Sequence, residues 1–370
     1  MNDRSFPDIA RVDAVDKVTG RTAYSADVPL PGLLHAMTVP AAVTKGKLVS
    51  IDVAAALAVL GVVRVMTSLD TPAPPPPPKG QNPPPPMLVS NIIFRGQPIA
   101  LVIAETLEAA IEGAEAVSAV YEAEPFTVRV DDAETPRENT EAPTFGEFTN
   151  AFAAATTTVS QTYITPANHH NPMELLSTTA VWSGGQLTIY EGTQGSNAVK
   201  ATVAQNLQID RSRVDVLSPQ IGGGFGQRGE VPRHTAIVAQ AARLLGRPVK
   251  LVMPRHQIFH NVRFRPEVHH TVQLGADRDG RIVAAHYDCL QQNSRSGRYR
   301  ADWYHAGPAK VYGIANYLGT SGDIRLDTQT PGQMRAPYEH PSSFAFESAV
   351  DELAYALGRD PVELRLVNDT

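Results

Sequence analysis

The chain has 370 residues, of which 42% are hydrophobic and 19% charged, and its net charge is −6 at pH 7. This length and composition are typical of a globular protein with two domains and a substantial apolar core. The acidic balance and the lack of a Lys/Arg-rich run argue against nucleic acid as a partner. No stretch approaches the roughly 18 uninterrupted apolar residues that a transmembrane helix needs, so membrane insertion is not expected.

The N-terminal stretch and the cysteine content bear on compartment and on metal chemistry. Residues 1–16 lack the apolar core of a signal peptide, so we expect a cytoplasmic protein or one exported while bound to a signal-bearing partner. Cys289 is the one cysteine of the chain, and it cannot form an internal disulfide, an iron–sulfur cluster or a cysteine-based zinc site by itself. Its alternating, strand-like surroundings predict a buried structural thiol.

The first third of the chain alternates between strand-like and helix-like patterns. Its apolar residues recur every second position or run continuously in the expected strands, and recur three and four positions apart in the expected helices. The strands are expected at Gly32–Val39, Gly61–Met66 and Gln97–Ala104, and the helices at Ile51–Val59 and 107–121. This alternation predicts a mixed α/β fold, of the α+β class, in which helices pack on a sheet.

Two stretches interrupt the pattern. Thr71–Pro86 has ten prolines among sixteen residues, so we expect a surface loop in polyproline II conformation, with recognition by an SH3-like partner as the alternative. The polar, acidic stretch 131–156 is expected to be a linker. It would separate a first domain, residues 1–130, from a second, residues 157–370.

The second domain is expected to continue the strand and helix alternation. Its elements are recognised by the same periodicities and by glycine or proline at their ends. The strands are expected at Thr179–Trp182, Leu187–Glu191, Val214–Ser218, Val249–Met253, Val268–Leu274 and Ile282–Leu290, and the helices at His234–Leu245 and Ser343–Leu357.

A glycine cluster lies between one of these strands and the next helix, within Ser218–Arg228. Three consecutive glycines permit positive φ angles and let a ligand approach the backbone amides, which suit an anion. A dinucleotide-binding GxGxxG motif would need glycine where Gln227 stands, and the Lys-Ser/Thr of a P-loop is absent. A tight loop without a ligand is the alternative.

Three further motifs accompany the glycine cluster: HHNPME at 169–174, GTQG at 192–195 and MRAPYE at 334–339. Together with IGGGFG, in this order and at these separations, they resemble the large subunit of molybdenum hydroxylases, the xanthine dehydrogenase and aldehyde oxidase family. The front segment, with VDKVTGRTAYSADVPLPGLLHA and GQPIALVIAETLEAA, is similar to that family's α/β hammerhead domain. The bacterial aldehyde oxidoreductases look closest. The resemblance implies a hammerhead domain followed by the first half of the molybdopterin-binding domain.

The resemblance implies roles for six residues in cofactor binding. Gln194 matches the glutamine whose amide hydrogen-bonds an oxo ligand of molybdenum. Gly223, Gly224, Phe225 and Gly226 match backbone beside the pterin and the ligands of the metal. Arg335 matches an arginine whose planar fork suits the polar edge of the cofactor or a substrate oxygen. The alternatives are a polar residue at a helix start, tight packing and a surface ion pair, respectively.

Other polar residues of these motifs are expected to be structural. Glu174 matches a turn that shapes the interior of the domain. His169 and His170 have no third ligand at convincing spacing, so no metal site is expected in this chain. The resemblance also implies that family members continue well past this sequence, and that the general-base glutamate lies in the continuation. No catalytic residue can therefore be assigned here, and the chain is expected to be inactive alone.

The implied activity is oxidation of aldehydes to carboxylic acids with water as the oxygen source. It would use molybdenum bound to molybdopterin, in its cytosine dinucleotide form. The expected partners are a polypeptide carrying the rest of the molybdopterin domain, an iron–sulfur subunit and an FAD subunit. Gly229 and Pro337 stand where purine-oxidising members carry a glutamate and an aromatic residue, which favours aldehydes. The alternatives are an N-heterocycle or purine hydroxylase subunit and a truncated, non-catalytic chain.

Overall fold

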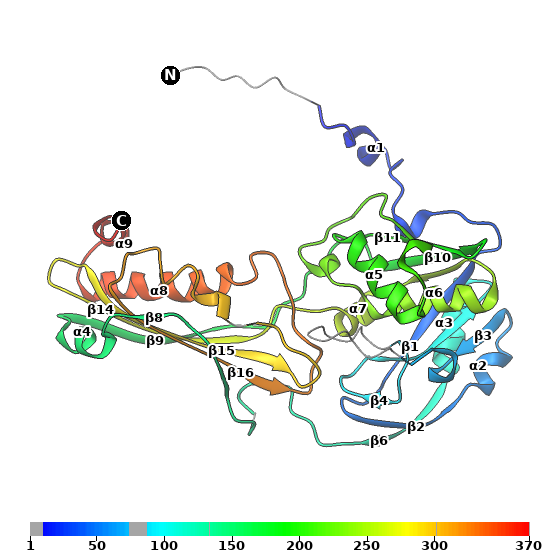
Figure 1. The fold of residues 1–370 in the computed structure, drawn as a ribbon, viewed down its shortest axis with the longest axis horizontal. Helices are drawn as coiled ribbons and strands as arrows, with labels where there is room; N and C mark the ends of the chain where they lie inside the picture. Colours follow the sequence, from blue (N-terminus) through cyan, green and yellow to red (C-terminus); the bar gives the residue numbers. More distant parts are fainter. Residues whose placement is uncertain (1–9, 74–86, 133, 301, 370) are drawn as a thin grey trace.

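The computed structural model describes residues 10–73, 87–132, 134–300 and 302–369. The molecule has two lobes joined side by side, and the short helix α1 (Ala14–Val18) projects from the larger lobe (Figure 1). The fold is mixed α/β, as predicted. The proline-rich stretch expected to be a polyproline II loop lies almost entirely outside the described residues.

A seven-stranded sheet organises the larger lobe, in the order β12-β11-β10-β13-β1-β5-β3. Its strands are β1 (Leu34–Pro40), β3 (Val62–Met66), β5 (Pro98–Ala104), β10 (Ser177–Ser183), β11 (Gln186–Glu191), β12 (Val214–Leu217) and β13 (Val249–Val252). The pairs β1·β13 and β11·β12 are parallel and the other pairs antiparallel. Strands from both sides of residues 131–156 therefore share one sheet.

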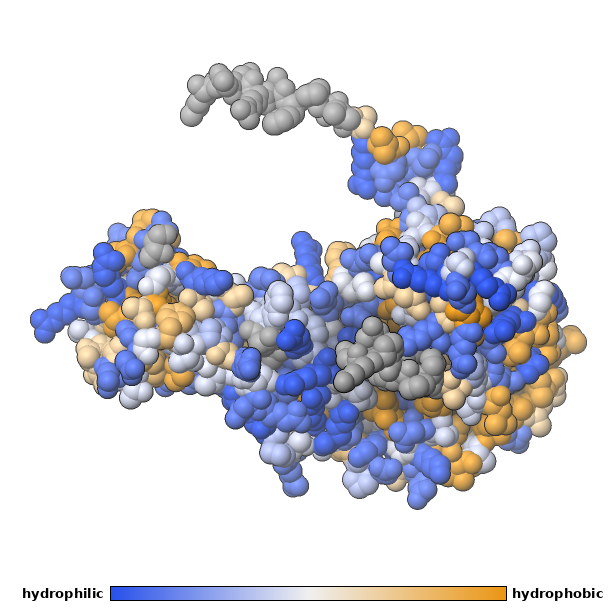
Figure 2. Space-filling model, in the orientation of Figure 1, coloured by the Kyte–Doolittle hydropathy of each residue, from blue (hydrophilic) through white to orange (hydrophobic). Residues whose placement is uncertain are grey.

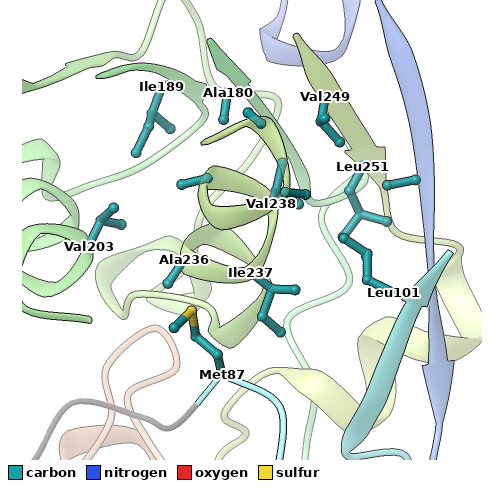
Figure 3. Packing of buried hydrophobic residues seen from close by; sticks show 14 of the residues in the cluster. Met87, Leu101, Ala180, Ile189, Val203, Ala236, Ile237, Val238, Val249 and Leu251 are labelled. Carbon is teal, nitrogen blue, oxygen red and sulfur yellow. The ribbon is translucent and has the colours of Figure 1, made fainter. Parts of the chain in front are cut away.

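Helix α6 (Arg233–Leu245) forms the centre of the core of this lobe. Its residues Ala236, Ile237 and Val238 pack against apolar side chains of the sheet and of α5 (Ser196–Leu207), as Figure 3 shows. The helix ends at Gly246, which adopts the left-handed conformation that glycine tolerates at a helix C-terminus. Burial of this apolar face fixes the start of α6, and so the loop before it.

A three-stranded sheet, β4-β2-β6, lies beside the front strands. Its strands are β2 (Gly46–Asp52), β4 (Asn91–Ile92) and β6 (Ser118–Ala123), and the helices nearby are α2 (Ala54–Ala58) and α3 (Leu107–Ala116). Two predicted helices were therefore too long. The one expected at 107–121 ends at Ala116 because the following residues pair with β2, and the one expected at Ile51–Val59 begins only after β2 ends.

The smaller lobe is a six-stranded sheet with helices on both faces. Its strands are β7 (Glu138–Thr140), β8 (Thr144–Phe145), β9 (Thr157–Thr165), β14 (Val268–Ala276), β15 (Ile282–Ser294) and β16 (Asn316–Leu326). Helix α8 (Glu339–Ala356) packs on the face that carries Val272 and Leu274, and α4 (Phe148–Ala154) meets the opposite face at Gly275. Cys289 is fully buried in this core, as predicted.

The stretch 131–156 is more than the linker that its composition predicted. It supplies β7 and β8, which pair with β16, and α4, which covers one end of the same sheet. Polar residues obscured these elements because two of the three are very short and their other face is open to solvent. The two strands β7 and β8 have no apolar pattern of their own, and backbone pairing with the long strand β16 stabilises them.

The remaining elements connect the sheets. They are α7 (Arg255–Asn261), α9 (Pro361–Val367) and the 3-10 turns η1 (Ser25–Asp27), η2 (Ser68–Asp70), η3 (Arg211–Arg213), η4 (Gln227–Gly229) and η5 (Asp302–His305). Within the described ranges, no helix has the length and apolarity needed to cross a membrane. Figure 2 shows mainly hydrophilic residues at the junction of the two lobes in that view.

Candidate functional site

Three loops of the larger lobe meet at one edge of the seven-stranded sheet. Strand β10 runs antiparallel to β11, and β12 runs parallel to β11. The start of β10 and the ends of β11 and β12 therefore lie at the same edge. The HHNPME turn enters β10, the GTQG loop leaves β11, and the glycine cluster leaves β12. The amide of Thr193 donates to Ser218 Oγ at 3.1 Å and joins the second loop to the third.

The glycine cluster wraps around Gln194. The amide of Gly226 donates to Gln194 Oε1 at 3.2 Å, and a Cβ on Gly224 would lie 2.7 Å from the same oxygen. Gly223, Phe225 and Gly226 have φ angles of +107°, +55° and +99°. Positive φ is costly for an aromatic residue, and the Phe225 side chain is 44% exposed, so core packing does not explain this conformation.

The arginine motif reaches this loop from the smaller lobe. Arg335 lies between β16 and α8, and its amide donates to the Phe225 carbonyl at 2.9 Å. A Cβ on Gly226 would lie 2.5 Å from the carbonyl oxygen of Gln333, so glycine permits the close approach of the two segments. The structure therefore brings Gln194, the residues 223–226 and Arg335 together at the junction of the lobes.

A buried ion pair supports the three loops from behind. Arg228 Nη2 lies 2.9 Å from Glu174 Oε2, and the Arg228 side chain is fully buried. Arg228 also donates to the carbonyls of Gly223, at 3.0 Å, and Gly192, at 2.9 Å, while Glu174 accepts from the Gly222 amide at 2.7 Å. Glu174 thus has the structural contacts expected of it. Arg228 is a residue that the sequence reasoning missed.

A second buried carboxyl lies at the end of β11, next to the GTQG loop. Glu191 accepts hydrogen bonds from Thr178 Oγ1 at 2.5 Å and from Thr235 Oγ1 at 2.7 Å. Complete burial raises the pKa of Glu191 to about 7, although the two hydroxyl donors and the charge of Arg228 act in the opposite direction. Its only sequence signal was an ionisable residue at the buried end of an apolar strand.

The front of the loops presents hydrogen-bond donors without partners. Among the described residues, the amides of Gly223, Gly224 and Phe225, the Gln194 Nε2 group and the Arg335 guanidinium make no hydrogen bond. Gln194 and Arg335 are exposed, and the alternating signs of φ along 223–225 are typical of a concave, anion-binding backbone. This donor set fits a group rich in negatively charged oxygens, as a molybdenum-bound pterin is.

The two histidines of the HHNPME turn have different contacts, and only His170 bonds the segment that leads to Arg335. His170 Nε2 donates to the Gln333 carbonyl at 2.6 Å, and His169 lies against the rings of Phe259 and Phe264. Burial lowers the pKa of His169 to about 4, with smaller contributions from neighbouring histidines. Within the part of the chain that the structure describes, no three His, Cys, Asp or Glu side chains are placed to hold a metal ion.

The two positions that bear on purine binding lie close to the glycine loop. Gly229 ends the η4 turn and is exposed, and a Cβ added there would have no other atom within 4 Å. Glu230, one position further on, pairs with Arg263 at 3.3 Å. Neither Gly229 nor Pro337 supplies a carboxylate or an aromatic ring toward the loops.

The geometry and the domain content agree on one family. Residues 19–125 match the model of the aldehyde oxidase and xanthine dehydrogenase a/b hammerhead domain, and residues 131–369 match the molybdopterin cofactor-binding domain. The chain therefore belongs to the aldehyde oxidase and xanthine dehydrogenase family of molybdopterin-binding proteins.

Individual relatives agree with this assignment. The aldehyde oxidoreductase molybdenum-binding subunit PaoC of Escherichia coli K12 is 34% identical over 97% of this chain and 50% of its own length. The xanthine dehydrogenase molybdenum-binding subunit of Escherichia coli O157:H7 is 30% identical over 97% of this chain and 51% of its own. The chain thus spans about half the length of the curated relatives it matches.

Solved structures show the same architecture. The aldehyde oxidoreductase from Desulfovibrio gigas superimposes with a TM-score of 0.87 at 27% identity, over 97% of this chain and 43% of that one. The quinoline 2-oxidoreductase from Pseudomonas putida 86 also gives a TM-score of 0.87, at 24% identity over 98% of this chain and 49% of that one, which shows the fold alone.

Proposed function

We propose that this chain forms one wall of the molybdenum cofactor pocket in an enzyme that oxidises aldehydes to carboxylic acids. One observation carries the proposal: the amides of 223–225, the Gln194 Nε2 group and the Arg335 guanidinium belong to one cluster of contacting loops and have no partner among the described residues. Arg228 and Glu174 hold the loops from behind and form no hydrogen bond with these donors. Donors fixed in this way stabilise negative charge at no further cost of reorganisation.

Each kind of donor is proposed to bind a different part of the cofactor or substrate. Gln194 is oriented by the Gly226 amide on its oxygen, so its Nε2 group is left to donate to an oxygen of the cofactor. The amides of 223–225 would hold the cofactor's edge, and the Arg335 fork would bind its polar groups or a substrate oxygen. When bound, the molybdenum cofactor supplies the two-electron redox chemistry, while the protein orients it and excludes competing reactions.

Aldehydes as substrates are favoured by two features. Gly229 and Pro337 leave the purine-recognition positions of the family unfilled, and the Escherichia coli relative PaoC is named an aldehyde oxidoreductase subunit. Because the chain spans about half of that relative, the general-base glutamate and the remaining pocket wall would come from a polypeptide that supplies the other half.

Electron transfer would need further subunits. Cys289 is buried in the smaller lobe, and its high pKa, raised to about 12 by burial, opposes the thiolate form that a cluster ligand requires. Iron–sulfur clusters would therefore reside on a partner subunit, and the family resemblance implies a further subunit for FAD. The resemblance to bacterial aldehyde oxidoreductases favours the cytosine dinucleotide form of the cofactor.

Cofactor loading tests the proposal with a matched pair of glutamines. We expect Gln194→Ala to lower the molybdenum content of the enzyme assembled with its partner subunits by about tenfold, because a charge-assisted donor is lost. Gln205→Ala, on α5 and away from the loops, should leave molybdenum content unchanged. Metal analysis and pterin fluorescence measure the loading.

Two outcomes would contradict the proposal. Equal loading of both variants would remove Gln194 from the cofactor pocket. Failure of the wild-type assembly to bind molybdenum at all would instead favour a truncated, non-catalytic chain.

A further inference from the structure

A cavity of about 260 Å³ opens directly beside the cofactor-facing loop. It begins at Gln227, the residue after Gly226, and continues along the N-terminal turn of α6 at Arg233. Asn261, Arg263 and Gln329 close the other side. The cavity therefore adjoins the loop 223–226, whose amides are proposed to bind the cofactor. A ligand in the cavity would lie next to that cofactor.

The charges that line the cavity do not balance. Arg233 and Arg263 are cations, and Glu230 is the one carboxylate among the lining residues. Glu230 pairs with Arg263 at 3.3 Å, whereas Arg233 makes no ion pair or hydrogen bond within the described part of the chain and rests 5.3 Å from the ring of Phe94. Burial and the charge of Arg263 lower the pKa of Arg233 to about 10, so it stays protonated at neutral pH.

Two buried amides of the lining are also unsatisfied. The side chain of Gln227 is 4% exposed, and neither its nitrogen nor its oxygen has a hydrogen-bond partner. Asn261 donates to the carbonyls of Gly96 and Gln257, but its Oδ1 atom has no partner. Buried polar groups are rarely left unsatisfied, so the Gln227 Nε2 group is a donor available to a ligand oxygen. The Gln227 Oε1 and Asn261 Oδ1 atoms are acceptors, which a bound water molecule would satisfy.

We propose that this cavity binds the carboxylate of substrates that carry one at a distance from the aldehyde group. Arg233 supplies the unpaired charge, Gln227 a neutral donor, and Arg263 a second guanidinium held partly neutralised by Glu230. This inference rests on the proposed aldehyde oxidation, because it names which aldehydes the same site selects. Anion binding by the cavity does not depend on that activity and is measured separately.

Direct binding is the first arm of the test. Terephthalate, the diacid that oxidation of 4-formylbenzoate would give, is titrated into the purified assembly by calorimetry, with inorganic phosphate as a second probe. We expect Arg233→Gln to weaken terephthalate binding by about tenfold and Arg233→Lys, which keeps the charge, to weaken it by less than about threefold. Glu230→Gln should strengthen binding by about threefold, because Arg263 loses its competing partner.

The matched control lies on the same helix. Arg243 rests 5.5 Å from the ring of Trp182, in the last turn of α6 and away from the cavity. Arg243→Gln should leave terephthalate binding unchanged. If Arg233→Gln does not fold, Arg263→Gln replaces it, and weaker binding is again expected, because the cavity loses a guanidinium and Glu230 loses its partner.

Steady-state kinetics form the second arm. In the assembled enzyme, Arg233→Gln should raise KM for 4-formylbenzoate about tenfold with kcat nearly unchanged, because a remote binding contact is lost. KM for benzaldehyde, which lacks the carboxylate, should not change.

The outcomes separate the inference from the function on which it rests. Arg233-dependent binding of terephthalate by an assembly that oxidises no aldehyde would support the anion site and refute the aldehyde activity. Aldehyde oxidation without any terephthalate binding would refute the site alone. Weaker binding in Glu230→Gln would contradict the electrostatic argument, and phosphate binding as tight as terephthalate binding would refute selection of a carboxylate-bearing substrate.

Discussion

The two layers of the loop cluster differ in how completely their polar groups are used. In the inner layer, Arg228 is fully buried and Glu174 is largely buried, and they bond to one another and to the backbone of all three loops. In the outer layer, Gln194 and Arg335 are exposed and retain donors without partners among the described residues. The two layers meet in the glycine loop, where the outer residues 223–225 lie within five positions of Arg228.

This difference indicates that the inner residues stabilise the loops and that the outer residues are available to bind a ligand. A saturated buried network makes its backbone geometry rigid, and an unsatisfied exposed group is available to a ligand. The outer donors can therefore keep their positions when nothing is bound. The comparison predicts large losses of stability from inner-layer substitutions and losses of binding without losses of stability from the outer layer.

The inner ion pair should give the largest effect. Arg228→Met removes the counter-ion of Glu174 and the donors to four loop carbonyls, so we expect the free energy of unfolding to fall by about 3–5 kcal/mol. Urea unfolding of the full chain, followed by circular dichroism, measures the change. Arg213→Met, on the exposed η3 turn, is the control, and a loss in Arg228→Met no larger than in this control would refute the two-layer division.

The buried carboxyl Glu191 should give the next largest effect, as a function of pH. Its folded-state pKa of about 7 lies above the usual 4.5, so the folded protein favours the protonated acid. Stability from this group is therefore greatest below pH 4.5 and is lost as the pH rises to about 7. The total loss is about 3 kcal/mol, at 1.36 kcal/mol for each unit of pKa shift.

Replacement of Glu191 by glutamine removes this titration. The difference in unfolding free energy between Glu191→Gln and wild type should grow in favour of the variant by about 3 kcal/mol between pH 4.5 and pH 7.5. Urea unfolding at several pH values measures it, and Glu112→Gln, on the exposed face of α3, should show no such trend. A constant difference for Glu191→Gln would show that the carboxyl titrates normally.

The sequence predicted the loops of the site better than it predicted the scaffold. Strands β10, β11 and β12 have strong apolar patterns, so the three loops that leave or enter them could be placed at strand ends. The Gly-Gly-Gly-Phe-Gly run indicated positive φ in advance, and the structure confirms it at Gly223 and Gly226. Local chemistry is sufficient for both conclusions.

The inner layer could not be predicted, because its partners are distant in sequence. Nothing near Arg228 indicates that its guanidinium would reach Glu174, 54 residues earlier, or the carbonyl of Gly192. The pairing of β1 with β13 is equally non-local, and it places strands from both parts of the chain in one sheet. Such contacts follow from packing of the whole lobe and carry no periodic signal.

Substitution of Gly226, which lies between the two layers, should reduce stability by an intermediate amount. Gly226→Ala forces an alanine to a φ of +99° and places its Cβ 2.5 Å from the Gln333 carbonyl oxygen. We expect a loss of about 1–3 kcal/mol and a displaced Arg335 segment. Gly229→Ala, three residues further on and in open space, should change stability by less than about 0.5 kcal/mol. Thermal unfolding of the two variants compares them directly, and equal melting temperatures would mean that Gly226 is not constrained.

The outer layer should give the smallest effect on stability, and that outcome is the most informative for function. Arg335→Gln removes an exposed guanidinium that no described residue binds, while its amide still donates to the Phe225 carbonyl. The free energy of unfolding should therefore change by less than about 0.5 kcal/mol, although molybdenum content or KM of the assembled enzyme should worsen. Parallel unfolding and metal analyses separate the two readouts. A stability loss comparable to that of Arg228→Met would place Arg335 in the scaffold, and intact loading with unchanged kinetics would remove it from the site.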